Sequence, residues 1–125
     1  MKDSLIIEET QDTPKIVLDQ SGGIFEVSGR SLPENAVKFY ASVLQWMEEY
    51  FNNPNQTTSF EFKLDYFNSA STKKIFEIIT ILEKLSQKNF SVIVIWYHSK
   101  DDELIKNRGQ EIKEMVDVPF EIRIY

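Results

Sequence analysis

A change of hydrophobic period in the middle of the chain constrains the fold more than any other feature. Residues 60–64 alternate between apolar and polar side chains, which is the two-residue period of a strand. Over residues 75–85 the apolar side chains instead recur every three or four positions, as in an amphipathic helix. The segment between them, residues 65–74, is therefore predicted to be an exposed strand-to-helix turn, with the helix beginning between Asn68 and Thr72.

Further elements follow one another without a long linker. Apolar segments at 16–18 and 24–27 flank a Gly-rich turn and predict a hairpin, and a short strand is expected at 5–8. The capping-box spacing of Ser31-Leu32-Pro33-Glu34 predicts a helix to about residue 51. That helix is expected to bury Val37, Tyr40, Val43, Leu44, Met47 and Phe51.

Strands and helices alternate in the second half of the chain. The helix after the turn should run to about residue 88, and the apolar run 92–96 is typical of a central strand covered on both faces. Asp101 or Asp102 should cap a third helix to about residue 115, before a strand at 120–124. This order predicts a single α/β domain over residues 1–125, a mixed sheet with packed helices and a right-handed parallel crossover from 60–64 to 92–96.

Composition excludes several classes of function. The 125 residues contain no cysteine, so disulfides and thiolate metal sites are impossible. The net charge of −6 makes nucleic acids and anionic membranes poor partners. No apolar run approaches the roughly 20 residues of a membrane helix, and the N-terminal residues do not resemble a signal peptide. A cytoplasmic protein without membrane insertion is expected.

Catalytic and metal-binding patterns are weak. His98, at the end of the 92–96 strand, is the only histidine; a lone histidine there serves as a base less often than as a surface or capping residue. The acidic run Asp101-Asp102-Glu103 suits a divalent cation, but it equally suits the positive end of a helix dipole. The sequence predicts no enzyme, no metal and no cofactor.

The predicted turn carries a cluster of hydroxyl groups at a helix N-terminus. Lys73 and Lys74 follow in the first helical turn, where positive charge is unfavourable by roughly 0.3–1 kcal/mol. An anion at this position, most simply a phosphate on Ser69, would reverse that penalty. The simpler interpretation is that Asn68, Ser69 or Ser71 only caps the helix. The spacing alone favours the cap.

Apolar side chains outside the main helical stripes are candidates for an interface. Phe76 is predicted on the opposite side of its helix from the apolar stripe, one turn beyond the hydroxyl cluster, and Ile81 lies well off the centre of that stripe. Phe39 and Trp46 fall at the margins of the preceding helix's apolar arc. An aromatic ring beside a modifiable hydroxyl suits an interface that a phosphate disrupts, although single exposed apolar residues are also normal.

Four segments, in order along nearly the whole chain, give it a resemblance to a known family. They are Thr10-Gln11-Asp12-Thr13-Pro14-Lys15-Ile16, Leu32-Pro33-Glu34-Asn35, Tyr66-Phe67-Asn68-Ser69-Ala70-Ser71 and Pro119-Phe120-Glu121-Ile122. On these segments the chain resembles the SiaC family of bacterial regulatory phosphoproteins, whose small domains are similar to the STAS domains of anti-anti-sigma factors. The family places its phosphoacceptor directly after the Asn of the turn, which corresponds to Ser69. Serine replaces the family's threonine there, and Ser71 remains a rival acceptor.

The resemblance implies a partner switch. A Ser/Thr kinase of histidine-kinase-like fold would phosphorylate Ser69, a PP2C-type phosphatase would reverse this, and the unphosphorylated form would bind an effector, in some relatives a diguanylate cyclase. Expected partner-binding residues are Asn68, Ala70, Ser71, Lys73, Lys74 and Phe76. The alternatives are a STAS-type sensor that binds a small molecule between the turns at 65–71 and 97–100, and a constitutive structural adaptor. A pocket with convergent polar groups would favour the sensor, whereas a convex apolar patch around Phe76 would favour the switch.

Overall fold

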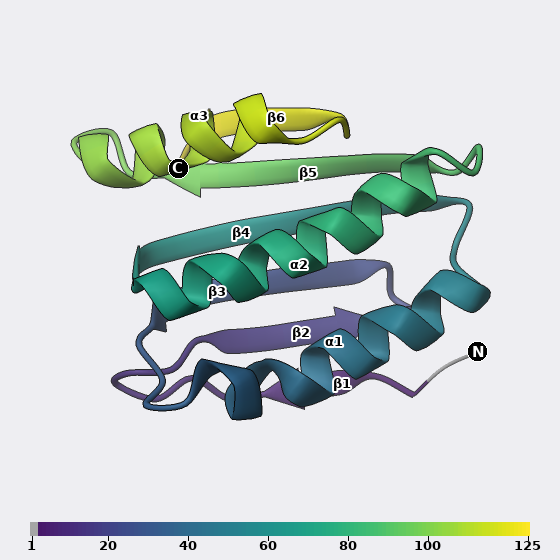
Figure 1. Ribbon diagram of the computed structural model, residues 1–125, viewed down its shortest axis with the longest axis horizontal. Coiled ribbons are helices and arrows are strands. Elements are labelled where there is room, and N and C mark those ends of the chain that lie inside the picture. Colours follow the sequence, from purple (N-terminus) through teal and green to yellow (C-terminus); the bar gives the residue numbers. More distant parts are fainter. Residues whose placement is uncertain (1–2) are drawn as a thin grey trace.

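Residues 3–125, which the computed structural model describes, form one six-stranded sheet and three helices (Figure 1). The strands are β1 (Leu5–Ile7), β2 (Lys15–Asp19), β3 (Ile24–Ser31), β4 (Thr57–Phe67), β5 (Ser91–His98) and β6 (Phe120–Ile124), and the helices are α1 (Ala36–Asn52), α2 (Ser69–Ser86) and α3 (Glu103–Met115). The predicted α/β class, hairpin and final strand are confirmed. None of these helices is long and apolar enough to cross a membrane.

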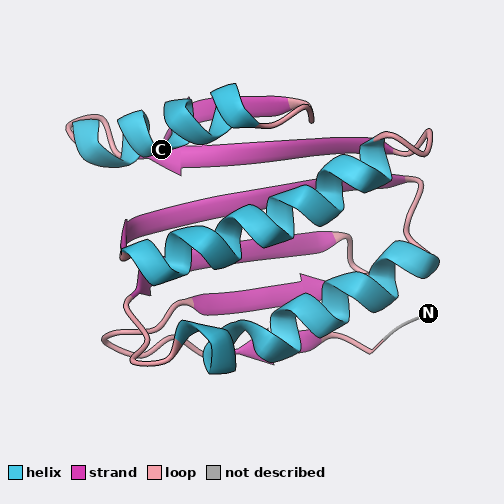
Figure 2. Ribbon diagram, in the orientation of Figure 1, coloured by secondary structure: helices cyan, strands magenta, loops and turns pink. Residues whose placement is uncertain are grey.

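The strands lie side by side in sequence order, and this order determines where the helices pack. β1, β2 and β3 pair antiparallel, whereas β3, β4, β5 and β6 pair parallel, so the sheet is mixed as predicted. Each parallel pair is joined through one helix, and right-handed connections that all step in one direction place every helix on the same face (Figure 2). The 92–96 strand, which the sequence predicted to be covered on both faces, therefore has helices on one face only.

The core lies between the sheet and this single helical layer. A row of neighbouring aromatic rings crosses the sheet beneath the helices, and Trp46 of α1 packs on its first member; the members are Phe25, Phe60, Phe62, Trp96 and Phe120. Trp46 and Ile81, which the sequence placed at the margin of one apolar stripe and off the centre of the other, are both buried. Trp46 packs on Phe25 of the sheet, and Ile81 lies on the side of α2 that packs against α1. Val37, predicted in the core, is 66% exposed.

The start of α1 differs from the predicted capping box. β3 continues through Ser31, which pairs with Phe67 of β4 after a register shift between Gly29 and Arg30. The helix instead begins after Asn35, whose side chain accepts a hydrogen bond from the Lys38 N–H at 3.0 Å. Because the true cap lies four residues later than predicted, Ser31 is free to take a different, buried role.

Candidate functional site

The predicted strand-to-helix turn is shorter than expected, but α2 begins within the predicted range, between Asn68 and Thr72. β4 extends to Phe67, and Asn68 is the N-cap. The Asn68 side-chain oxygen accepts from the Ser71 N–H at 2.9 Å, and its backbone oxygen accepts from the Thr72 N–H at 3.0 Å. Of the three residues considered as the cap of this helix, Asn68 is the N-cap. The hydroxyl group of Ser69 therefore does not serve as the helix cap.

Ser69 and Ala70 are the first two residues of α2, and both are exposed. Their N–H groups have no acceptor within the helix, as in the first turn of any α-helix. A group attached to the Ser69 oxygen would therefore meet solvent and the positive end of the helix dipole.

Ser71 has the opposite environment. It is fully buried, and its hydroxyl donates to the Ser31 backbone oxygen at 3.0 Å and accepts from the Ser31 hydroxyl at 2.8 Å. The Tyr40 hydroxyl of α1 lies 2.6 Å from the Ser31 hydroxyl, and desolvation by burial raises the pKa of Tyr40 to about 12. The expectation that Ser71 contacts partners or competes as phosphoacceptor does not fit this burial. Its hydroxyl joins α1, β3 and α2.

The two lysines of the first turn are not equivalent. Lys74 forms an ion pair with Glu77 at 2.8 Å, so its charge is balanced within α2. Lys73 is exposed and lines a shallow surface hollow beside Ser69, whose walls also include Tyr66, Phe67, Asn68 and Thr72.

Arg108 of α3 also lines that hollow and was not identified from the sequence. Its ion pair with Glu111 is long, at 3.9 Å, and its side chain is 50% exposed. No local pattern marks Arg108. Only the sequential strand order, which sets α2 and α3 on the same face, could have indicated it.

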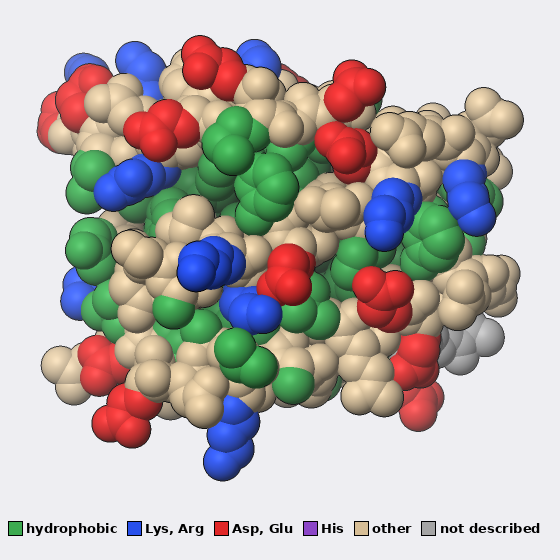
Figure 3. Space-filling view, viewed as in Figure 1, with side chains coloured by type: hydrophobic (Ala, Val, Ile, Leu, Met, Phe, Trp, Pro, Cys, Tyr) green, Lys and Arg blue, Asp and Glu red, His purple; other side chains and the backbone are tan. Residues whose placement is uncertain are grey.

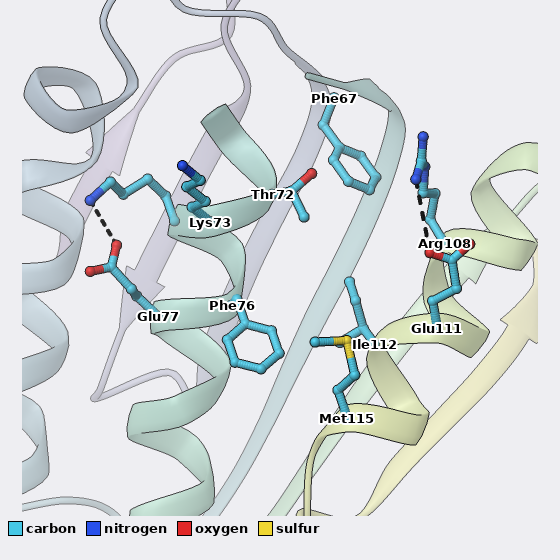
Figure 4. A pocket seen from close by; sticks show the side chains of 10 residues that line it. Phe67, Thr72, Lys73, Phe76, Glu77, Arg108, Glu111, Ile112 and Met115 are labelled. Carbon is cyan, nitrogen blue, oxygen red and sulfur yellow. Dashed lines mark ion pairs between the residues drawn. The ribbon is translucent and has the colours of Figure 1, made fainter. Parts of the chain in front are cut away.

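A mostly apolar groove of about 520 Å³ runs between α2 and α3 and begins next to this hollow. Phe76, Ile112 and Met115 point toward one another across it (Figure 4). Hydrophobic side chains gather in the hollowed surface between the two helices (Figure 3). Phe76 is half-buried in this groove, so its predicted position on the outer face of α2 is wrong, and the convex patch that would have favoured the switch is not found around it. Thr72, Lys73 and Arg108 line both the groove and the hollow.

The second predicted turn, residues 97–100, is partly strand. His98 ends β5 and is 5% exposed, with its Nδ1 2.8 Å from the Ser99 backbone oxygen. Tyr125 connects the two strand ends: its N–H donates to the His98 oxygen at 3.1 Å and its hydroxyl to Asp65 at 3.2 Å. The hollow beside Ser69 is lined by Arg108 and by no residue of the 97–100 segment, so it is not the site between the two turns that the sensor interpretation predicted.

The acidic run before α3 acts as a helix cap. The Asp102 side chain accepts from the Ile105 N–H at 3.0 Å. Within residues 3–125, no group of three or more His, Cys, Asp or Glu side chains is arranged to hold a metal ion.

Sequence comparison identifies the family. The model of the SiaC family of regulatory phosphoproteins matches residues 7–125. An uncharacterized protein of Pseudomonas aeruginosa strain UCBPP-PA14 is 28% identical over 121 residues, which cover 97% of this chain and 96% of the relative.

Solved structures agree with this match over the whole fold. SiaC of P. aeruginosa superposes with a TM-score of 0.90 at 27% identity, covering 99% of this chain and 100% of that chain. A crystal structure of the diguanylate cyclase SiaD in complex with its activator SiaC, also from P. aeruginosa, matches with a TM-score of 0.90 at 29% identity, covering 97% and 99%. The sheet, the three helices and their order are therefore those of the solved relatives.

Proposed function

Because this chain belongs to the SiaC family of regulatory phosphoproteins, we propose that it is a non-enzymatic partner switch controlled by phosphorylation of Ser69. A Ser/Thr kinase of histidine-kinase-like fold adds the phosphate and a PP2C-type phosphatase removes it. The unphosphorylated form binds an effector such as a diguanylate cyclase. The switch acts in the cytoplasm, where its kinase has ATP.

The observation that carries this proposal is the contrast between the two serines of the turn. Ser69 is exposed at the first position of α2, whereas Ser71 is fully buried and hydrogen-bonded. A kinase can reach the first hydroxyl without unfolding the helix. In a family described as phosphoproteins, this favours Ser69 as the acceptor.

The effector surface proposed here is the α2 N-terminus together with the apolar groove. It includes Asn68, Ala70, Lys73, Lys74 and Phe76, with Ile112 and Met115 across the groove. A relative has been solved with a diguanylate cyclase, which supports an effector of that class. Phosphate on Ser69 adds about −1.5 to −2 charges at the end of the groove, where apolar contact requires desolvation.

Mass spectrometry and binding measurements test the proposal. Protein purified from its own host should carry phosphate on Ser69. Ser69→Ala should bind a diguanylate cyclase of that host as tightly as the unmodified protein, whereas the phosphorylated form should bind at least tenfold more weakly. Phe76→Ala should also weaken binding, and Val37→Ala, which removes an exposed apolar side chain from α1, is the matched control. Equal binding by the phosphorylated and unphosphorylated forms would indicate a constitutive adaptor. If none of the hydroxyl groups of the turn carries phosphate, the switch is rejected.

The size of the groove supports a second candidate, a small-molecule sensor. Its volume of about 520 Å³ lies within the range of ligand sites, and its walls are mostly apolar with a few charged groups at the rim. An apolar ligand that stabilises the protein to heat, and loses this effect in Met115→Ala, would favour the sensor over the switch.

A further inference from the structure

The hollow beside Ser69 is positively charged in a protein whose overall charge is negative. The chain has 20 acidic and 14 basic residues, yet the charged residues that line this hollow, Lys73 and Arg108, are both cations. They come from two different helices. Lys73 lies four residues after Ser69, on the same face of α2, and Arg108 reaches the hollow from α3.

Resting on the proposed function of Ser69, we infer that Lys73 and Arg108 form a two-helix clamp for its phosphate. A phosphate oxygen extends a few ångströms beyond the serine oxygen, into the hollow that both cations line. The guanidinium group suits this role because it binds phosphate through two parallel N–H donors. The exposed N–H groups at the start of α2 add to the same positive field.

In the unmodified protein, the ion pair of Arg108 with Glu111 is weak enough for Arg108 to bind a phosphate instead. Its ion pair with Glu111 is long and solvent-exposed, so exchanging that carboxylate for a doubly charged phosphate is favourable. Lys74, by contrast, is held by Glu77 at 2.8 Å and is not part of the clamp. The phosphate therefore recruits one lysine of the pair and an arginine from the neighbouring helix.

The clamp links phosphorylation to the groove. Lys73 and Arg108 also line the mouth of the apolar groove, so a phosphate bound between them ties α2 to α3 across that mouth. The modified form thus differs from the unmodified form in the positions of two cations at the effector surface, in addition to the charge itself.

The titration of phosphoserine tests the clamp without any kinase. Phosphoserine is installed at position 69 during translation, and its second pKa is followed by ³¹P NMR. In the wild-type background this pKa should fall below its usual value of about 6. Arg108→Gln and Lys73→Gln should each raise it by about half a unit. Glu111→Gln, which removes the competing carboxylate, should lower it further.

Lys113→Gln is the matched control, because it removes an exposed cation from α3 that does not line the hollow. If the second pKa of phosphoserine 69 is the same in Arg108→Gln as in Lys113→Gln, there is no clamp. The failure of the clamp and the failure of the switch can be told apart. A clamped phosphate on a serine that is unmodified in the host would reject the switch alone. An unclamped phosphate that still blocks effector binding would reject the clamp alone.

Discussion

At the scale of single residues, the hydroxyl groups at positions 69 and 71 lie in opposite environments, one exposed and one fully buried. Ser71→Ala should lower the free energy of unfolding by about 1–2 kcal/mol, because it removes the two buried hydrogen bonds of the residue 71 hydroxyl, although the Ser31 backbone oxygen keeps the Asn68 N–H as a donor. Ser69→Ala should change it by no more than about 0.5 kcal/mol, since that side chain is exposed and Asn68 provides the cap. Urea denaturation of both variants checks this pair. Equal losses would contradict the separation of a modifiable serine from a structural one.

Tyr40, in the same buried network, should make stability depend on alkaline pH. Burial raises its pKa from 10 to about 12, so the folded state holds the proton more tightly than the unfolded state. The stability this contributes is fully present below pH 10 and is lost as the pH rises through 12, by about 2–3 kcal/mol in total. Tyr40→Phe should flatten the stability profile in that window. A profile that is equally steep in both proteins would show that other groups cause the alkaline loss.

At the scale of elements, α3 depends on one glycine. A Cβ added at Gly109 would lie 2.4 Å from the Trp96 ring, whose indole N–H donates to the Ile105 backbone oxygen at 2.9 Å. Gly109→Ala should therefore destabilise the protein although alanine is favoured over glycine in helices by about 1 kcal/mol. Asn107→Ala, at an exposed position of α3, should be neutral or slightly stabilising. Thermal unfolding compares them, and a stabilised Gly109→Ala would mean that α3 moves freely over Trp96.

Element boundaries show what the sequence could predict. The periods of β4, α2 and β6 were readable because their packing faces repeat along the chain. The start of α1 was misplaced because Ser31 is held in β3 by its pairing with Phe67, a contact that no local pattern reveals. His98 was predicted in a turn, but its pairing with Ile124 of β6 extends β5 beyond its apolar run. This pairing is likewise not visible in the local sequence.

At the scale of the whole molecule, the candidate site depends on strand order. Asn68 and Ser69 were predictable from one segment, whereas Arg108 and the groove exist only because α2 and α3 pack side by side on one face. The role proposed for Ser69 comes from the resemblance to a family. Neither the resemblance nor the hydrophobic pattern supplied the depth of the groove, since Phe76 lies at its wall rather than on a convex surface.

The position of α3 and β6 at the end of the sheet has an energetic consequence. β6 is an edge strand, and α3 buries three residues where α2 buries seven, so this end unit should open locally at a lower free energy than β3, β4 and α2. Amide hydrogen exchange should be fastest, among the regular elements from β2 onward, in α3 and β6; uniform protection across the sheet would contradict this. The α3 side of the groove would then lie in the part of the molecule that has the lowest free energy of local unfolding. A phosphate that ties Arg108 to α2 should slow exchange there first, so the modification would act by changing how often one end of the protein opens.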